Sequence, residues 1–247
     1  MNDFNSKSDE IYSIIKLVNE DNYAGAAKLI HSLLADKEVV LSQDDWKNLG
    51  HVLLVLGKFE LAKTAYSKSF CLESLCFVQI LLKELDEAQS VLAKLSESPA
   101  TLWCNFLIEV FSKKQKITNM PSFFTIRHFM EFTVFYLLLS GNQPYIDLLM
   151  NNFDKLVKIN TDVEKLVGYA YLNYGDLTSA IFFLNNSLNR EKFDGEIYYK
   201  LGKIYYMKGL YHDSLAMLHN AQIVLPYHYP TKALMEKVLI RLSDDKK

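Results

Sequence analysis

Glycines in the C-terminal half of the chain recur at a fixed interval. Gly141, Gly175 and Gly209 are each 34 positions apart, and Gly168 and Gly202 are separated by the same 34 positions. A period between about 20 and 50 residues is typical of repeat architectures, in which each unit buries its apolar face against its neighbours. The interval therefore predicts an array of similar units, and it decides how the residues inside each unit are interpreted.

Each 34-residue unit has the pattern of two helices. Apolar residues recur three and four positions apart, and glycine and proline fall at the ends of these segments, so no strand is predicted. Gly168 and Gly202 fall inside a helix, where glycine costs about 1 kcal/mol relative to alanine. We expect close approach of the paired helix to explain them. Gly175 and Gly209 are expected to end that helix in the left-handed conformation.

The residues around the glycines match a known repeat. Segment 195–228 carries the matching positions Tyr198, Leu201, Gly202, Tyr205, Gly209, Ala221 and Pro226. It departs from the pattern at Ser214 and Leu218. A second segment, 43–76, carries Trp46, Leu49, Gly50, Gly57, Ala62 and Tyr66 in the same frame. This pattern resembles the tetratricopeptide repeat (TPR), a helix-turn-helix unit of 34 residues.

The resemblance implies an all-α fold, a right-handed superhelical solenoid of antiparallel helix pairs. We expect a single solenoid over 1–247, with irregular repeats at 8–113, regular repeats at 121–228 and a capping helix at 229–243. The polar segment 112–119 is the expected interruption, after which Pro121 starts a helix that runs to Leu139. The polar final helix is expected to cover the last apolar face of the stack.

Composition and charge narrow the classes of partner. Apolar residues make up 50% of the 247 positions, and 27 basic against 29 acidic residues leave a formal charge of −2. This balance gives no electrostatic reason to expect nucleic acid or an anionic membrane. The N-terminus lacks the pattern of a secretory signal, and the charge-free run 132–139 is too short to span a bilayer. We therefore expect an intracellular protein, cytoplasmic or nuclear.

No motif for catalysis, a metal or a cofactor is recognisable. Gly57-Lys58 and Gly202-Lys203 lack the spacing and the following hydroxyl residue of a phosphate-binding loop. The six histidines form no pair with metal-ligand spacing. The cysteines are expected to be reduced core residues, namely Cys71, Cys76 and Cys104. The sequence therefore predicts a protein that is not an enzyme, with no cofactor and no metal.

The resemblance also implies a concave groove, lined by the first helix of each pair, that binds peptides or partner helices. Carrying the groove-facing positions over by the period gives the nine predicted protein-binding residues Lys47, His51, Leu54, Phe135, Tyr169, Leu172, Tyr199, Lys203 and Tyr206, and it also gives the groove positions Glu131, Leu138 and Lys165. Packing between repeats is an equally open interpretation for four of them, namely Phe135, Tyr169, Tyr199 and Tyr206. The carboxylate clamp of some relatives is not expected, because His51, Phe132 and Asp162 stand at its positions.

The predicted function is a non-catalytic scaffold or adaptor for protein–protein interaction. Over about the first 110 residues, the order of helix pairs resembles the N-terminal half of the TPR subunits of the anaphase-promoting complex. That resemblance implies a homodimer and a self-associating subunit of a multi-protein assembly. The alternative is a TPR chaperone that holds a client or secreted protein in its groove. Either function requires a protein or peptide partner, which could be helical, and neither nucleic acid nor a membrane is expected.

Overall fold

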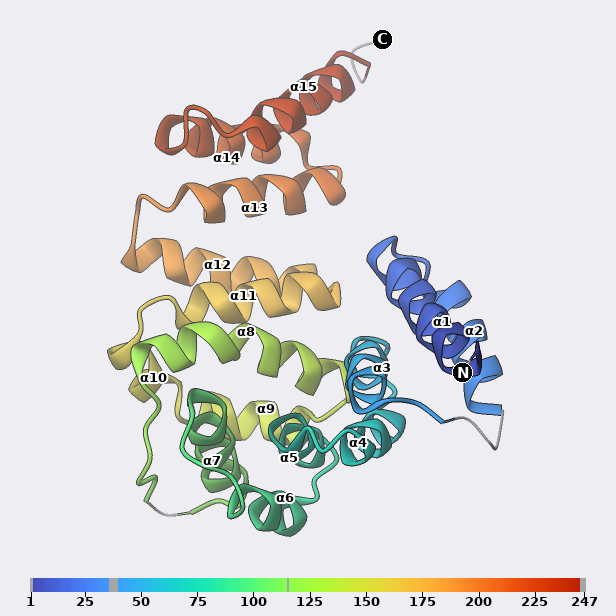
Figure 1. Cartoon of the computed structure of the whole chain (residues 1–247). Coiled ribbons are helices and arrows are strands. Elements are labelled where there is room, and N and C mark those ends of the chain that lie inside the picture. Colours follow the sequence, from blue (N-terminus) through green and yellow to red (C-terminus); the bar gives the residue numbers. More distant parts are fainter. Residues whose placement is uncertain (1, 36–39, 115, 245–247) are drawn as a thin grey trace. The chain divides into compact units, whose positions relative to one another are not determined.

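The computed structural model describes residues 2–35, 40–114 and 116–244, with side chains from residue 7 onward. These residues form fifteen helices and no strand, which confirms the all-α prediction (Figure 1). In chain order the helices are α1 (Asn2–Asn19), α2 (Tyr23–Ala35), α3 (Gln43–Val55), α4 (Phe59–Lys68), α5 (Leu72–Leu81), α6 (Leu85–Leu92), α7 (Pro99–Phe111), α8 (Phe123–Leu139), α9 (Gln143–Met150), α10 (Phe153–Ile159), α11 (Val163–Tyr174), α12 (Leu177–Arg190), α13 (Gly195–Met207), α14 (Tyr211–Val224) and α15 (Tyr229–Asp244).

The helices form two compact units. Unit 1 consists of Met1–Pro121 and Leu139–Met150, and unit 2 consists of Ser122–Leu138 and Asn151–Lys247. The chain therefore leaves unit 1 for α8, returns to it for α9 and leaves it again before α10. A single continuous solenoid over the whole chain stays a prediction.

Unit 1 is built from helical hairpins. α1 pairs with α2, α3 with α4 and α5 with α6, while α7 packs against α5, α6 and α9. Tyr66 of α4 is fully buried, and a Cβ added at Gly50 of α3 would lie 2.7 Å from its ring. Trp103 and Phe106 of α7 are also buried, with ring centroids 5.3 Å apart. The glycine inside α3 thus has the packing reason expected of a repeat glycine.

A buried carboxylate holds the polar segment that follows α7. Glu109 is 3% exposed, and it accepts hydrogen bonds from the Thr118 hydroxyl and from the amides of Thr118 (2.9 Å) and Asn119 (3.3 Å). Burial alone would raise the pKa of Glu109, but these hydrogen bonds and the Lys114 ammonium lower that pKa on balance. The predicted interruption is therefore tied to α7 around Thr118.

Unit 2 contains the regular repeats. α11 pairs with α12 and α13 pairs with α14, and α15 packs against both α14 and α13. α15 covers the segment predicted as the capping helix. The core between the two hairpins consists of the fully buried side chains Ala180, Leu184, Ile197, Leu201 and Ile204.

The glycine period has the two structural causes expected from the sequence. A Cβ at Gly168 would lie 2.8 Å from the Leu184 side chain, and a Cβ at Gly202 would lie 2.7 Å from the Leu218 side chain. Only glycine therefore lets each second helix approach this closely. At the helix ends, Gly175 has a φ of 96° and Gly209 has a φ of 73°. Both expectations are confirmed.

The helix pair that begins with α8 departs from the regular pattern. α8 begins at Phe123, two residues after the expected start, and the Ser122 hydroxyl accepts a hydrogen bond from the Thr125 amide (3.2 Å). Instead of one second helix, the chain forms the two short helices α9 and α10, which are interrupted at Asn151 and Asn152.

Side-chain contacts explain why α9 belongs to unit 1. The Asn142 side-chain amide donates a hydrogen bond to the Leu81 carbonyl at the end of α5. Tyr145 stacks on Phe111 of α7, with ring centroids 4.1 Å apart and the planes 12° from parallel. These contacts hold α9 on α5 and α7.

Candidate functional site

A lysine joins the first helices of the two regular repeats in unit 2. Lys165 of α11 places its Nζ 2.7 Å from Asp194 Oδ2 and 2.7 Å from Glu196 Oε2 at the start of α13. Asp194 is also the N-cap of α13, and its other carboxylate oxygen accepts hydrogen bonds from the amides of Glu196 and Ile197. Burial acts to lower the pKa of Lys165, but the two carboxylates outweigh this effect and raise it.

Tyr169 lies one helical turn after Lys165, and its ring is close to two ammonium groups. Lys165 Nζ is 5.8 Å and Lys200 Nζ is 5.4 Å from the centroid of its ring, within the range of cation–π attraction. Burial and the charges of Glu196, Asp194 and Glu131 raise the pKa of the Tyr169 hydroxyl. That hydroxyl is buried and close to Glu196, yet outside hydrogen-bond geometry, and it has no partner in the described part of the chain.

A second polar contact joins α11 to α8. Asn173 of α11 donates a hydrogen bond to Glu131 Oε1 of α8 (2.9 Å). Burial raises the pKa of Glu131, although Lys200 and Asn173 oppose this effect. Phe135 of α8 is half-buried and lies edge-on to Tyr136, and Leu172 packs on the core of unit 2.

Tyr199 and Tyr206 of α13 both make contacts with later helices. The Tyr199 ring meets His228, just before α15, with centroids 4.8 Å apart. The Tyr206 ring lies 5.8 Å from Tyr211 of α14, and its hydroxyl interacts with Arg241 of α15. Both tyrosines remain half-buried, whereas Lys203 on the same helix is exposed. Packing within the array and ligand contact thus remain compatible for the two rings.

We call the resulting surface the α11–α13 face. It consists of Lys165, Tyr169 and Asn173 from α11 and Tyr199, Lys200 and Lys203 from α13. Spacings of four residues align the three members from α11, and on α13 Lys203 lies four positions after Tyr199 and three after Lys200. The predicted binding residues included Tyr169, Tyr199 and Lys203 of this set, and the period also gave Lys165 as a groove position. The charged partners of Lys165 were not predicted. Asp194 and Lys165 are 29 positions apart, and no local pattern in the sequence indicates that they pair.

The three predicted residues of unit 1 lie in different environments along α3. Lys47 is exposed, and His51 Nδ1 lies 2.8 Å from the Tyr66 hydroxyl. Partial burial and the Lys47 charge lower the pKa of His51. Leu54 is only 5% exposed, so it is a core residue. Its side chain is not accessible for the binding role that was predicted for it. Val52, Leu53 and Leu54 are all buried, so α3 is covered over most of its circumference at this point.

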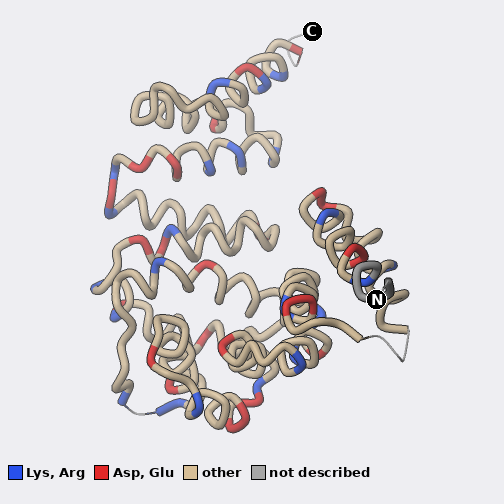
Figure 2. Tube along the Cα trace, in the orientation of Figure 1, with Lys and Arg blue, Asp and Glu red and all other residues tan. Residues whose placement is uncertain are grey.

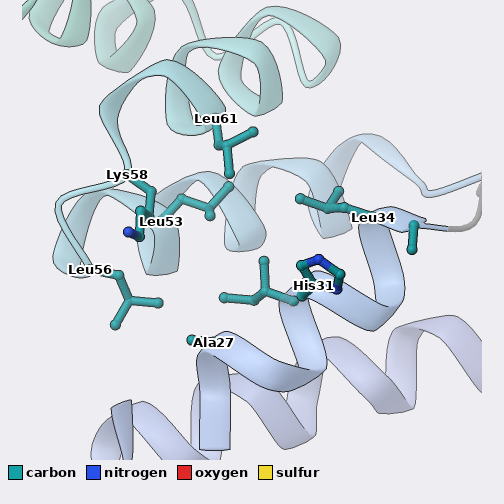
Figure 3. Close-up of a pocket in the computed structure, with 9 residues that line it drawn as sticks. Ala27, His31, Leu34, Leu53, Leu56, Lys58 and Leu61 are labelled. Atoms are coloured by element: carbon teal, nitrogen blue, oxygen red, sulfur yellow. The ribbon is translucent and has the colours of Figure 1, made fainter. Parts of the chain in front are cut away.

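Unit 1 also holds an apolar cleft that the sequence did not indicate. Its volume is about 350 Å³, and side chains of α3 and α4 face those of α2 across it (Figure 3). It is lined by Ala27, Ile30, His31, Leu34, Ala35, Leu53, Leu56, Lys58 and Leu61. His31 and Lys58 are the polar members, and Leu61 is 44% exposed. The cleft lies where α2 stands apart from the α3–α4 hairpin.

Charges and potential ligands for metals are dispersed. Figure 2 shows basic and acidic residues interspersed along both units. Among the residues that the structure describes, no three His, Cys, Asp or Glu side chains gather as a metal site would require. Over the same residues, no helix has the length and hydropathy needed to cross a membrane. Cys76 and Cys104 are buried and Cys71 is half-buried, all as free thiols.

Neither a family model nor a curated protein matches this sequence. TPR proteins are among the solved structures that resemble it. The APC/C hetero-tetramer Cut9-Hcn1 aligns at 15% identity and a TM-score of 0.36 over 93% of this chain and 42% of that chain. A TPR protein from Parabacteroides merdae aligns at 16% identity and a TM-score of 0.39, over 95% of this chain and 99% of that chain. The P58(IPK) TPR domain aligns at 15% identity and a TM-score of 0.33, over 94% of this chain and 64% of that chain. This chain therefore spans less than half of the first of these proteins.

Proposed function

We propose that the chain is a non-catalytic scaffold that binds a partner protein on the α11–α13 face. The observation that carries the proposal is the approach of two lysines, Lys165 from α11 and Lys200 from α13, to the ring of Tyr169. Aromatic side chains contribute most of the binding energy at many interfaces. Lys203 is exposed, so an acidic group of the partner can reach it. A partner segment with apolar and acidic side chains therefore suits this face.

Charge reversal on this face tests the proposal. When the wild-type chain is purified from its source cells, a partner protein should co-purify with it in a near-equal molar amount. The double variant Lys200→Glu with Lys203→Glu should lose that partner. Lys158→Glu, on the exposed side of α10, is the matched control and should retain it. Circular dichroism checks that all three proteins are folded. Full retention by the double variant would contradict binding on this face, and absence of any such partner would contradict the scaffold function.

We further propose self-association, as a subunit of an assembly such as the anaphase-promoting complex would require. Support comes from the aromatic side chains that the α1–α2 hairpin exposes, since Tyr12 is 72% and Tyr23 is 47% exposed. Light scattering over a range of concentrations should then give twice the chain mass of 28.5 kDa. Tyr12→Glu should halve that mass. A mass of one chain at every concentration would contradict self-association.

A chaperone function is the second candidate, and the apolar cleft of unit 1 favours it. A cleft lined mainly by leucine and alanine can hold an apolar side chain of an unfolded client. If so, the chain should delay aggregation of reduced insulin, a model client, and Leu61→Glu should abolish the delay. Leu29→Glu, at a similarly exposed leucine that does not line the cleft, should not. Equal activity of both variants would exclude the cleft as the client site.

A further inference from the structure

One face of α2 lines the apolar cleft of unit 1. Its lining residues occupy positions i, i+3, i+4, i+7 and i+8, which share one side of a helix: Ala27, Ile30, His31, Leu34 and Ala35. Figure 3 shows this side of α2 turned toward the end of α3 and the start of α4. The cleft between them has a volume of about 350 Å³, near the lower end of the range for small-molecule sites.

The lining of this cleft suits a ligand with few polar groups. Seven of its nine lining residues are leucine, isoleucine or alanine, and only the side chains of Lys58 and His31 can form hydrogen bonds. A peptide segment would bring an N–H and a C=O group with each residue, and most of these groups would find no partner among such side chains. An alkyl chain carries no polar group, so it meets this lining without that cost.

Both polar side chains at the cleft are basic and exposed. Neither the Lys58 ammonium nor the His31 ring has an ion-pair or hydrogen-bond partner within the ranges that the structure describes. Glu60, two positions after Lys58, instead lies 2.9 Å from Lys63 Nζ. Among the described residues that line the cleft there is no carboxylate and no Trp, Tyr or Phe ring, so a cation would find no attractive partner. The charge at the cleft therefore favours an anion.

We propose that this cleft binds a free fatty acid. The alkyl chain lies between Leu34 of α2 and Leu53 of α3, and the carboxylate pairs with the Lys58 ammonium. Each buried CH₂ group adds to the affinity, whereas an ion pair with an exposed ammonium adds little affinity and selects the sign of the head group. The cleft belongs to unit 1, so the proposal does not depend on the scaffold function of the α11–α13 face. It also gives the cleft a different occupant from the client of a chaperone.

The test is a calorimetric titration of the full chain with decanoate, kept below the concentration at which decanoate forms micelles. Decyltrimethylammonium carries an alkyl chain of the same length with the opposite charge, and butyrate carries the same head group on a short chain. Decanoate should bind to saturation at one site per chain. Decyltrimethylammonium should bind about threefold more weakly, because it forms no ion pair with Lys58. Butyrate should bind more weakly by about tenfold or more, because it buries less apolar surface.

Two variants of lining residues locate the site. Lys58→Met keeps an aliphatic side chain and removes the charge, so it should weaken decanoate binding about threefold and abolish the preference for decanoate over the cation. Leu61→Glu places a carboxylate at a lining position that is 44% exposed, and it should weaken decanoate binding about tenfold. Lys94→Met, at an exposed lysine outside the cleft, is the matched control and should leave the affinity unchanged.

Circular dichroism checks that each variant is folded, and if Leu61→Glu is not, Lys58→Met at its exposed position provides the comparison. The proposal would be overturned by the absence of saturable decanoate binding, by equal affinity for decanoate and decyltrimethylammonium, or by equal decanoate affinity of the Lys58→Met and Lys94→Met proteins. Tighter binding of the blocked peptide acetyl-Leu-Leu-Leu-amide than of decanoate would also overturn it, and would favour a protein client as the occupant of the cleft.

Discussion

Alanine at position 202 provides a direct test of the packing between α13 and α14. Inside a helix, alanine is favoured over glycine by about 1 kcal/mol. The added methyl carbon would, however, lie 2.7 Å from both Cδ2 and Cγ of Leu218, and overpacking typically costs about 1 to 3 kcal/mol. Gly202→Ala should therefore lower the free energy of unfolding by about 0 to 2 kcal/mol.

The sign of this effect should reverse once Leu218 is truncated. Leu218 is fully buried, so Leu218→Ala alone should cost about 2 to 5 kcal/mol. It removes both close atoms, and the next contact of the added methyl is the Ser214 carbonyl oxygen at 3.4 Å, an ordinary van der Waals distance. In this background Gly202→Ala should stabilise the protein by up to about 1 kcal/mol. The coupling energy between the two sites is then about 1 to 3 kcal/mol.

Urea unfolding followed by circular dichroism measures the midpoint and slope for the four proteins of this cycle. Both tryptophans, Trp46 and Trp103, belong to unit 1, so hydrogen exchange of α13 amides supplies the local measurement in unit 2. Ala216→Gly, at an exposed position of α14, should cost about 1 kcal/mol in both backgrounds. The reasoning would be refuted if Gly202→Ala lowered the free energy of unfolding equally in the wild-type and the Leu218→Ala backgrounds.

Two other substitutions test buried polar groups. Glu109→Gln should lower the free energy of unfolding by about 1 to 3 kcal/mol at pH 7. Because folding lowers the pKa of Glu109, its contribution is complete above the ordinary value of about 4.3 and is lost as pH falls through the folded pKa. The urea midpoints of the two proteins should therefore converge in acid, and a constant gap would contradict this. Tyr169→Phe should leave the midpoint unchanged or raise it, since the hydroxyl lacks a partner; a clear drop would reveal a hydrogen bond.

The elements that sequence reasoning predicted well are those fixed by local chemistry. The interval between Gly168 and Gly202 predicted the two regular hairpins, because a helix interior accepts glycine readily only where another helix approaches closely. The same reasoning could not predict the split between α9 and α10, where α9 packs on α7 and Asn142, just before α9, bonds to the end of α5. Such contacts depend on residues far apart in the chain.

The candidate site was predicted less completely for a related reason. Period alone placed Tyr169 on the face of a first helix, but the pairing of Lys165 with Asp194 depends on how two helices are rotated against each other. Leu54 was assigned to the surface by the same period and is buried. A difference of one position in helix phase moves a side chain by about 100° around the axis, since a turn takes 3.6 residues.

The return of α9 to unit 1 has a consequence for the order in which the chain can fold during synthesis. Unit 1 acquires its last helix only when residue 150 has left the ribosome, after α8, which belongs to unit 2 up to Leu138, has already emerged. Until then Phe111 lacks Tyr145 and the Leu81 carbonyl lacks Asn142. A fragment that stops at Pro121 would keep this apolar surface uncovered, so dissecting the protein into separately expressed halves requires residues 139–150 to be supplied to the first half.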